Sequence, residues 1–269
     1  MTKNALRLLG LLPSHPRDFA AHLSGRMAQL AETLRNRDGS YDAVAFETAA
    51  EIVGNTLGVP VADFLDDQHA RELAIQIEET QEQISSENPF PLELSADLHL
   101  ARFSYALCRA MKPSVIVETG VAYGMTSAFI LKALSVNGSG TLHSIDLPPL
   151  AHNADHFVGI LVPEALRRNW ILRRGTSRRI LPLMLRELGR VDAFVHDSLH
   201  TRWNIRRELD IVTPYLGRQA FVLADDVDGN SAFASWVDTV LPTLSTTVRE
   251  AAKKGLFGAA VFASDRPSV

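Results

Sequence analysis

The sequence predicts an α/β protein with a doubly wound, mainly parallel sheet of seven strands and an N-terminal helical extension. From residue 113 onward, apolar runs of strand length alternate with amphipathic segments, which is typical of a parallel sheet covered on both faces. Before that point, apolar residues recur at helical spacing and strand patterns are almost absent. We therefore expect a helical region at 1–92 and the α/β domain at 93–269.

The first region has apolar residues every three or four positions, as one face of a helix requires. Its helices are expected at 17–36, 43–57, 61–85 and 95–111, with a linker at 86–91. In the second region, strands are expected at 114–119, 141–147, 170–173, 193–196, 220–224, 246–251 and 257–263. Helices between them are expected at 126–134, 163–168, 178–188 and 201–215.

Composition restricts the class of protein. The 269 residues are 46% hydrophobic and 22% charged, as in globular proteins, and the net charge of −4 gives no general attraction to nucleic acid. One cysteine, Cys108, excludes a disulfide framework and a cysteine-rich zinc site. No apolar run has the length of a membrane span, and the stretch at 5–13 is too short and broken for a signal peptide. We expect a cytoplasmic protein with no membrane or nucleic-acid partner.

The turn after the first predicted strand favours a ligand with a cationic group. Glu118 stands two residues before Gly120, and Gly124 begins the next helix. This spacing differs from the G-x-G-x-x-G fingerprint of dinucleotide sites. A carboxylate here would repel a diphosphate and attract an amine, whereas an ordinary tight turn would explain the glycines alone.

Asp146 ends the second predicted strand, where an acid can accept hydrogen bonds from both hydroxyls of a ribose. The alternative is a solvated acid beside a proline-containing loop. Together, Glu118 and Asp146 indicate a nucleoside with an amino-acid tail.

Acids also end the fourth and fifth predicted strands, as Asp197 and as the pair Asp225 and Asp226. If these strands are neighbours, the carboxylates converge and raise each other's pKa values. A divalent cation would relieve the repulsion, and oxygen ligands favour Mg²⁺, Mn²⁺ or Ca²⁺. Alternatively, Asp225 or Asp226 caps the following turn while Asp197 stands alone. His200 is the candidate general base, although it could equally cap a helix.

The motifs Glu118-Thr-Gly120 with Gly124, and Ser144-Ile-Asp146, resemble those of class I S-adenosylmethionine-dependent methyltransferases over roughly residues 95–269. The resemblance implies a Rossmann-like sheet, with the methionine part of the cofactor along Glu118 and Gly120 and its ribose at Asp146. Gly175-Thr176-Ser177 resembles the segment that lines the adenine. The full cofactor set implied is Glu118, Gly120, Tyr123, Gly124, Ser127, Asp146, Thr176, Ser177 and Asp197.

The strand-end acids resemble those of metal-dependent O-methyltransferases, including the catechol type, the sugar-modifying macrolide type and bacterial enzymes of glycan or natural-product tailoring. This resemblance implies magnesium, or manganese or calcium, held by Asp197, Asp225 and Asp226. His200 and Asp197 would then be the catalytic residues. A helical extension on this fold often packs against a second subunit, so a homodimer or higher homo-oligomer is expected.

The main hypothesis is therefore a metal-assisted methyltransferase that uses S-adenosylmethionine and modifies a hydroxyl of a sugar or other small molecule. One alternative is a metal-independent N- or O-methyltransferase. Another is a catalytically inactive cofactor-binding or scaffold protein. A nicotinamide-dependent oxidoreductase is less favoured, because the third glycine is missing and Glu118 is present.

Overall fold

All seven predicted strands occur, within a few residues of the expected positions, in the computed structural model. It describes residues 16–34, 39–84, 97–151, 153–251 and 255–263. The strands are β1 (Ala43–Val44), β2 (Val115–Thr119), β3 (Thr141–Asp146), β4 (Trp170–Arg174), β5 (Val191–His196), β6 (Leu216–Ala224), β7 (Leu244–Arg249) and β8 (Leu256–Phe262).

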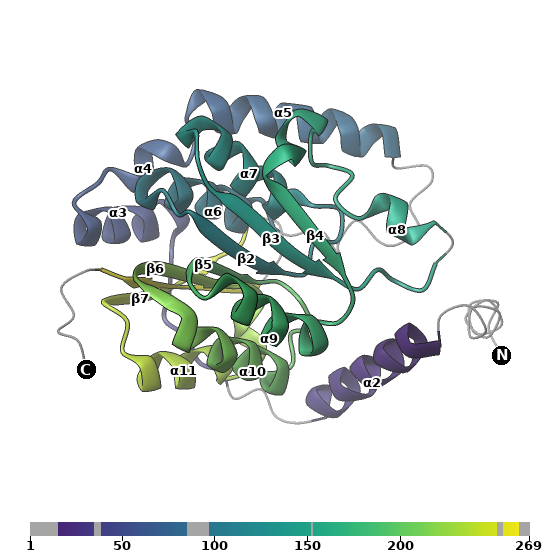
Figure 1. The fold of residues 1–269 in the computed structure, drawn as a ribbon. Coiled ribbons are helices and arrows are strands. Elements are labelled where there is room, and N and C mark those ends of the chain that lie inside the picture. Colours follow the sequence, from purple (N-terminus) through teal and green to yellow (C-terminus); the bar gives the residue numbers. More distant parts are fainter. Residues whose placement is uncertain (1–15, 35–38, 85–96, 152, 252–254, 264–269) are drawn as a thin grey trace.

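The sheet has the order β1-β7-β8-β6-β5-β2-β3-β4 (Figure 1). Only β8 is antiparallel, against β6 and β7. The expected number of seven strands is wrong by one, because β1 pairs with the end of β7 inside a stretch predicted to be helical. A strand of two residues is too short to show a period of its own, and its pairing is set by the distant partner strand.

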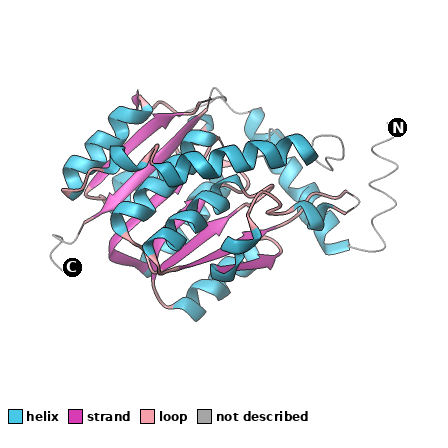
Figure 2. Ribbon diagram, turned by 90° about the horizontal axis from the view of Figure 1, so that it is seen from above, coloured by secondary structure: helices cyan, strands magenta, loops and turns pink. Residues whose placement is uncertain are grey.

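Helices cover both faces of the sheet (Figure 2), which confirms the doubly wound fold. One hydrophobic core contains residues of α3 (Phe46–Leu57), α4 (Val61–Phe64), α5 (Gln68–Ile84), α6 (Leu98–Met111) and α7 (Met125–Asn137). The other contains residues of α9 (Ser177–Leu188), α10 (Arg202–Val212) and α11 (Ala232–Val240). The remaining elements are α2 (Pro16–Thr33), α8 (Ala154–Phe157) and the 3₁₀ helices η2 (Glu164–Asn169), η3 (Thr213–Tyr215) and η4 (Val227–Gly229). None of the described helices has the length and hydropathy that a membrane crossing requires.

Three helical predictions need correction. The helix expected at 61–85 is divided into α4 and α5, because the Asp67 carboxylate accepts a hydrogen bond from the Ala70 backbone N–H (2.9 Å) and so starts a new helix. The helix expected at 163–168 is the 3₁₀ helix η2. The short helices α8 and α11 were not expected. The linker predicted at 86–91 and the boundary between residues 92 and 93 lie outside the described residues.

The strand order reverses between β2 and β5, and ligands of open α/β sheets bind beyond the carboxyl ends of the strands at such a point. In the register, Thr119 of β2 is level with His196 of β5, and His196 is level with Ala224 of β6. The residues that follow these three strands therefore lie side by side. β5 and β6 are neighbours, which is the condition under which the strand-end acids are expected to converge.

Two glycines allow chain segments to meet closely at this edge. Gly120 has φ +85°, and a Cβ there would lie 1.8 Å from the Asp197 carbonyl oxygen. Gly124 has φ +90°, and a Cβ there would lie 2.7 Å from the Gly159 Cα. Both positions thus need glycine for backbone conformation and for close packing of the main chain.

We predict that Gly120→Ala lowers the free energy of unfolding by roughly 3 kcal/mol or more. The added methyl group would both strain the backbone at a positive φ and clash with the main chain of Asp197 after β5. Gly138→Ala is the matched control, since Gly138 has φ +74° but open space around it. It should cost about 1 kcal/mol. Urea unfolding of both variants measures the difference. Equal losses would show that the contact with Asp197 contributes nothing beyond backbone strain.

Candidate functional site

Glu118 is completely buried at the end of β2. The hydroxyls of Ser127 and Ser144 donate to its Oε2 at 2.6 and 2.7 Å, whereas its buried Oε1 has no hydrogen-bond partner. Burial raises the pKa of Glu118 to about 8; the two hydroxyls oppose this shift, and the charges of Asp197 and Asp146 add to it. An unmatched carboxyl oxygen of this kind would be stabilised by an ammonium group.

Asp146 lies where the sequence predicts it, at the end of β3, and it is nearly buried. Its Oδ2 accepts hydrogen bonds from the backbone N–H groups of Val121 (2.7 Å) and Ala122 (3.1 Å). Burial raises its pKa, and these two hydrogen bonds oppose the shift. Asp146 therefore holds the glycine turn in shape with one carboxylate oxygen, a role that the sequence did not indicate.

The other predicted cofactor residues lie around this turn. Thr176 precedes α9, and the Ser177 hydroxyl accepts a hydrogen bond from Arg207 Nη2 at 2.9 Å. They are next to Asp146, because the Gly175 backbone N–H donates to the Asp146 carbonyl at 2.7 Å. Tyr123 is completely buried in the hydrophobic core.

The predicted acids converge. Asp197 follows β5 and Asp225 follows β6, and their backbone N–H groups donate to Thr119 and His196 carbonyls at 2.8 Å. One ligand atom from each of Asp197, His200 and Asp225 lies within 4.8 Å of the other two, and the same holds for Asp225, Asp226 and Glu250. We call these residues, Asp197, His200, Asp225, Asp226 and Glu250, the acidic cluster.

Asp225 is completely buried and neither of its carboxylate oxygens has a hydrogen-bond partner. Burial and then the charge of Asp197 raise its pKa to about 7, and His200 opposes the shift. Asp226 is at the start of η4 with φ +49°, and its side chain makes no capping hydrogen bond there. The unmatched oxygens of Asp225, among further carboxylates, fit a hard divalent cation better than a capping role.

His200 lies between two of these acids. Its Nδ1 is 3.0 Å from Asp226 Oδ2, and its Nε2 is 3.5 Å from Asp197 Oδ1. Burial lowers the pKa of His200, but the two carboxylates, together with the charge of Asp225, raise it well above its ordinary value. The surrounding carboxylates thus favour the protonated imidazole, and a decrease in this negative charge would make His200 a better proton acceptor.

Part of this chain is similar to known proteins. Residues 117–227 match a family model described as a methyltransferase domain. That segment contains the glycine turn, Asp146 and all three predicted strand-end acids. The segment at residues 117–227 is therefore similar to a methyltransferase domain. The match does not support the nicotinamide-dependent alternative, and no curated protein matches the sequence.

Solved methyltransferases share the fold at low sequence identity. An O-methyltransferase from Bacillus cereus in complex with SAH is 13% identical, with a TM-score of 0.53, over 80% of this chain and 97% of that chain. TomG, an O-methyltransferase from Streptomyces achromogenes involved in tomaymycin synthesis and solved with SAM, is 15% identical, with a TM-score of 0.52, over 80% and 96%. A methyltransferase from Geobacter sulfurreducens is 17% identical, with a TM-score of 0.52, over 70% and 88%.

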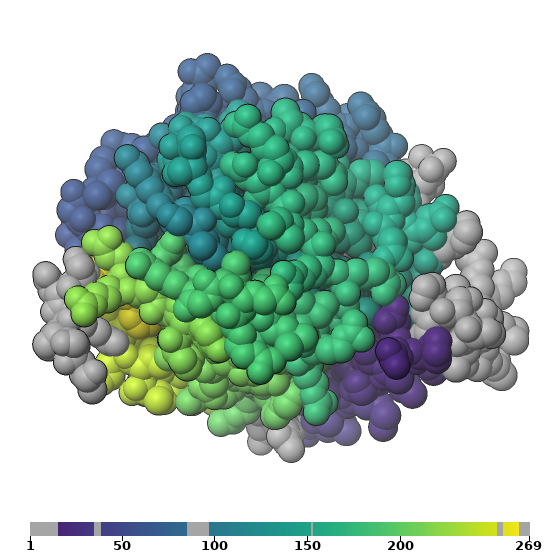
Figure 3. Space-filling model, in the orientation of Figure 1, coloured from purple at the N-terminus to yellow at the C-terminus, as the bar shows by residue number. Residues whose placement is uncertain are grey.

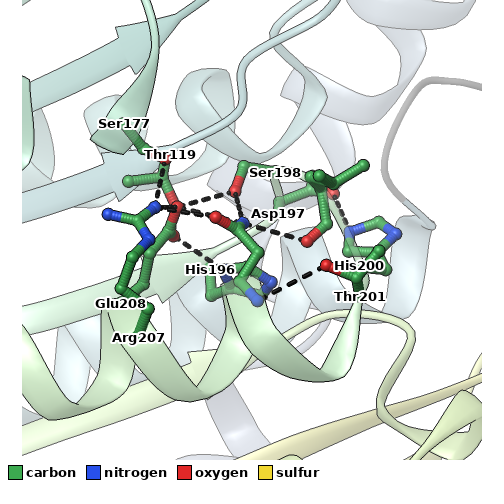
Figure 4. Close-up of polar contacts among 11 residues, drawn as sticks. Thr119, Ser177, His196, Asp197, Ser198, His200, Thr201, Arg207 and Glu208 are labelled. Atoms are coloured by element: carbon green, nitrogen blue, oxygen red, sulfur yellow. Dashed lines mark hydrogen bonds and ion pairs between the residues drawn. The ribbon is translucent and has the colours of Figure 1, made fainter. Parts of the chain in front are cut away.

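A buried polar network that the sequence did not indicate lies behind the candidate site (Figure 4). Glu208 of α10 is its centre and is completely buried. Its Oε2 is 2.5 Å from Thr119 Oγ1 and 2.7 Å from His196 Nδ1. Its Oε1 accepts hydrogen bonds from Ser198 Oγ (3.0 Å), Asn204 Nδ2 (3.2 Å) and Arg207 Nη2 (3.0 Å).

Glu208 connects the two strands on which the site is built. Thr119 immediately precedes Gly120, while His196 and Ser198 flank Asp197. Burial alone would raise the pKa of Glu208, but the charge of His196 and these hydrogen bonds lower it to about 2. The signal in the sequence was a charged residue on the apolar face of α10, between Ile205 and Leu209.

Helix α2 contacts the loop after β3, the end of β4 and the start of α10. His22 Nε2 is 2.8 Å from the Pro148 carbonyl, Arg174 donates to Asp18 at 2.7 Å, and the Arg202 N–H donates to Glu32 at 3.0 Å. Figure 3 shows α2, in purple, seated against the green segments at this edge. The helical extension therefore covers part of the edge where the site lies.

We predict that Glu208→Gln lowers the free energy of unfolding by roughly 3 kcal/mol at pH 7, because it leaves buried cationic and donor groups unmatched. The folded pKa, about 2, lies below the ordinary value of 4.5. The stabilisation is therefore full above pH 4.5 and decreases as the pH falls toward 2. Urea unfolding should show that the difference in free energy of unfolding between wild type and variant decreases below pH 4.5.

Asp210→Asn on the same helix is the control, because Asp210 is exposed and pairs only with Arg206 among the ion pairs described here. It should change stability by less than about 1 kcal/mol. A loss in Glu208→Gln no larger than in this control would contradict the role given to the buried network.

Proposed function

We propose that the protein is a metal-assisted O-methyltransferase that transfers the methyl group of S-adenosylmethionine to a hydroxyl of a sugar or another small molecule. The observation that supports this most strongly is the contact between the glycine turn and the acidic cluster. Gly120 abuts the Asp197 carbonyl, and Asp225, with its two unmatched oxygens, lies beside Asp197. A cofactor on the turn and a cation on the acids would therefore be neighbours.

In this proposal the cofactor binds along the ends of β2, β3 and β4. The free Oε1 of Glu118 would accept from its ammonium group, and Asp146 would accept from its ribose. Thr176 and Ser177 would lie along the adenine. Gly120, Gly124 and Ser127 shape the turn, Asp197 lies against it, and Tyr123 contributes as part of the buried support for the same turn.

The cation would be held by Asp197, Asp225 and Asp226, and when bound it would lower the pKa of an acceptor hydroxyl. The chain itself would orient that hydroxyl in line with the sulfonium, because Asp197 lies against the turn that we assign to the cofactor. His200 would take the proton once its carboxylate neighbours are neutralised and its pKa falls toward its ordinary range.

The acceptor side is proposed to include α2, within the helical region assigned to residues 1–92. This helix contacts the loop after β3, the end of β4 and the start of α10. Four apolar side chains on α2 or directly after it are exposed, and this is the surface that we expect a homodimer to cover: Leu23, Met27, Leu30 and Leu34.

One observation favours a second candidate, a metal-independent methyltransferase. His200 already lies between Asp197 and Asp226, and a protonated imidazole there supplies part of the positive charge that a cation would supply. In that case the acids would orient the acceptor and hold the His200 ring. The two candidates differ in whether a divalent cation binds at Asp225.

We predict that S-adenosylhomocysteine binding at pH 7 releases close to one proton. Glu118, with a pKa of about 8, is mainly protonated beforehand, and an ammonium partner favours its ionised form. The release should decrease above pH 8, where the carboxyl is already ionised. Calorimetry in phosphate and Tris buffers measures it.

Two comparisons complete this experiment. The Glu118→Gln variant should release no proton and bind about tenfold or more weakly. 5′-Methylthioadenosine, which has the same nucleoside without the amino-acid tail, should release none from wild type. Equal release with both ligands would place the ammonium group away from Glu118.

We predict that Asp225→Asn abolishes Mg²⁺ or Mn²⁺ binding, because Asp225 is the buried acid whose two oxygens lack other partners. S-adenosylhomocysteine binding should be retained. Thermal-shift titration with each ligand measures both properties. A wild-type protein that shows no response to either cation, with methyl transfer intact, would favour the metal-independent candidate.

A further inference from the structure

Glu250 joins the acidic cluster from a part of the sheet that supplies none of the proposed metal ligands. It directly follows β7 and is nearly buried, and its backbone N–H donates to the Gly255 carbonyl at 3.2 Å. One oxygen each from Asp225, Asp226 and Glu250 can be chosen so that all three lie within 4.8 Å of one another. A further carboxylate therefore faces the same space as Asp225 and Asp226.

Asp225 gives independent evidence that this space takes a ligand. Its carboxylate is completely buried, and neither oxygen has a hydrogen-bond partner. Buried carboxylates are normally matched by donors or by a cation, because desolvation is otherwise costly. Asp225 is common to two groups of ligand atoms, one with Asp197 and His200 and the other with Asp226 and Glu250.

These two groups differ in chemistry. The first contains two carboxylates and the imidazole of His200, whose Nε2 is 3.5 Å from Asp197 Oδ1. The second consists of carboxylates alone, which is the donor set that Mg²⁺, Mn²⁺ and Ca²⁺ prefer.

Gly255 lies beside the carboxylates of Asp226 and Glu250. A Cβ at this position would lie 2.6 Å from Glu250 Oε2 and 2.8 Å from Asp226 Oδ1. Gly255 does not have the positive φ that would by itself require glycine. The missing side chain therefore leaves space around two carboxylates of the cluster rather than relieving the backbone.

We propose that Glu250 is a ligand of the divalent cation, together with Asp225 and Asp226. The proposal rests on the metal-assisted function proposed above and adds a ligand that lies outside residues 117–227, the segment matched by the family model. Asp225 belongs to both groups of ligand atoms, so Glu250 would add to the set of Asp197, Asp225 and Asp226 proposed above.

The role of Glu250 as a ligand is tested by Mn²⁺ binding to the full-length, metal-stripped protein. Calorimetry and the electron paramagnetic resonance signal of the bound ion measure this binding. Glu250→Gln should weaken Mn²⁺ binding by about tenfold or more, since affinity depends on the number of charged ligands. Gly255→Ala should also weaken it, because the added methyl occupies space beside Glu250 and Asp226.

Two controls separate ligand loss from misfolding and from a general change of charge. S-adenosylhomocysteine should bind Glu250→Gln and Gly255→Ala as tightly as wild type. Glu164→Gln should leave Mn²⁺ binding unchanged, because the Glu164 side chain is 94% exposed. If Glu250→Gln fails to bind S-adenosylhomocysteine, Gly255→Ala decides the question without removing an acid.

The outcomes distinguish this proposal from the one on which it rests. Wild-type binding of Mn²⁺ with no weakening in Glu250→Gln or Gly255→Ala would overturn the role of Glu250 and leave the metal-assisted function standing. No Mn²⁺ binding by wild type would overturn both.

Discussion

The site depends on one contact, in which the turn at Gly120 packs directly against the main chain that follows β5. Gly120 leaves no room for a side chain beside the Asp197 carbonyl, and the Asp197 N–H donates back to the Thr119 carbonyl. The ends of β2 and β5 are thereby fixed at main-chain contact distance. Because the two strands are neighbours in a parallel sheet, the turn assigned to the cofactor and the acidic cluster are held together by the sheet itself.

Three buried carboxylates around this contact show how donors decide the charge of an acid. Glu208 lies within hydrogen-bond distance of five side chains, and its pKa falls to about 2 despite burial. Glu118 and Asp225 have too few donors, and burial raises their pKa values to about 8 and about 7. The first acid stabilises the fold, whereas the other two have unmatched oxygens that suit cationic ligands.

The sequence predicts the sheet and the meeting of Asp197 with Asp225, because buried strands have recognisable lengths and their carboxyl ends share one edge. It could not predict features that depend on distant partners. The pairing of β1 is set by β7, and the helix break at Asp67 is set by a side-chain cap. Glu250 comes to the cluster only because β7 lies two strands away from β6, with the antiparallel β8 between them. Glu208 was recognisable only as a charge on an apolar helix face.

Helix α2 lies against the loop after β3, the end of β4 and the start of α10, and it is joined to them by polar contacts at His22, Asp18 and Glu32. Contacts of this kind exchange readily with water, and the helix buries no residue completely. Displacement of α2 would therefore uncover this edge of the molecule without opening the packed core of the sheet beneath it.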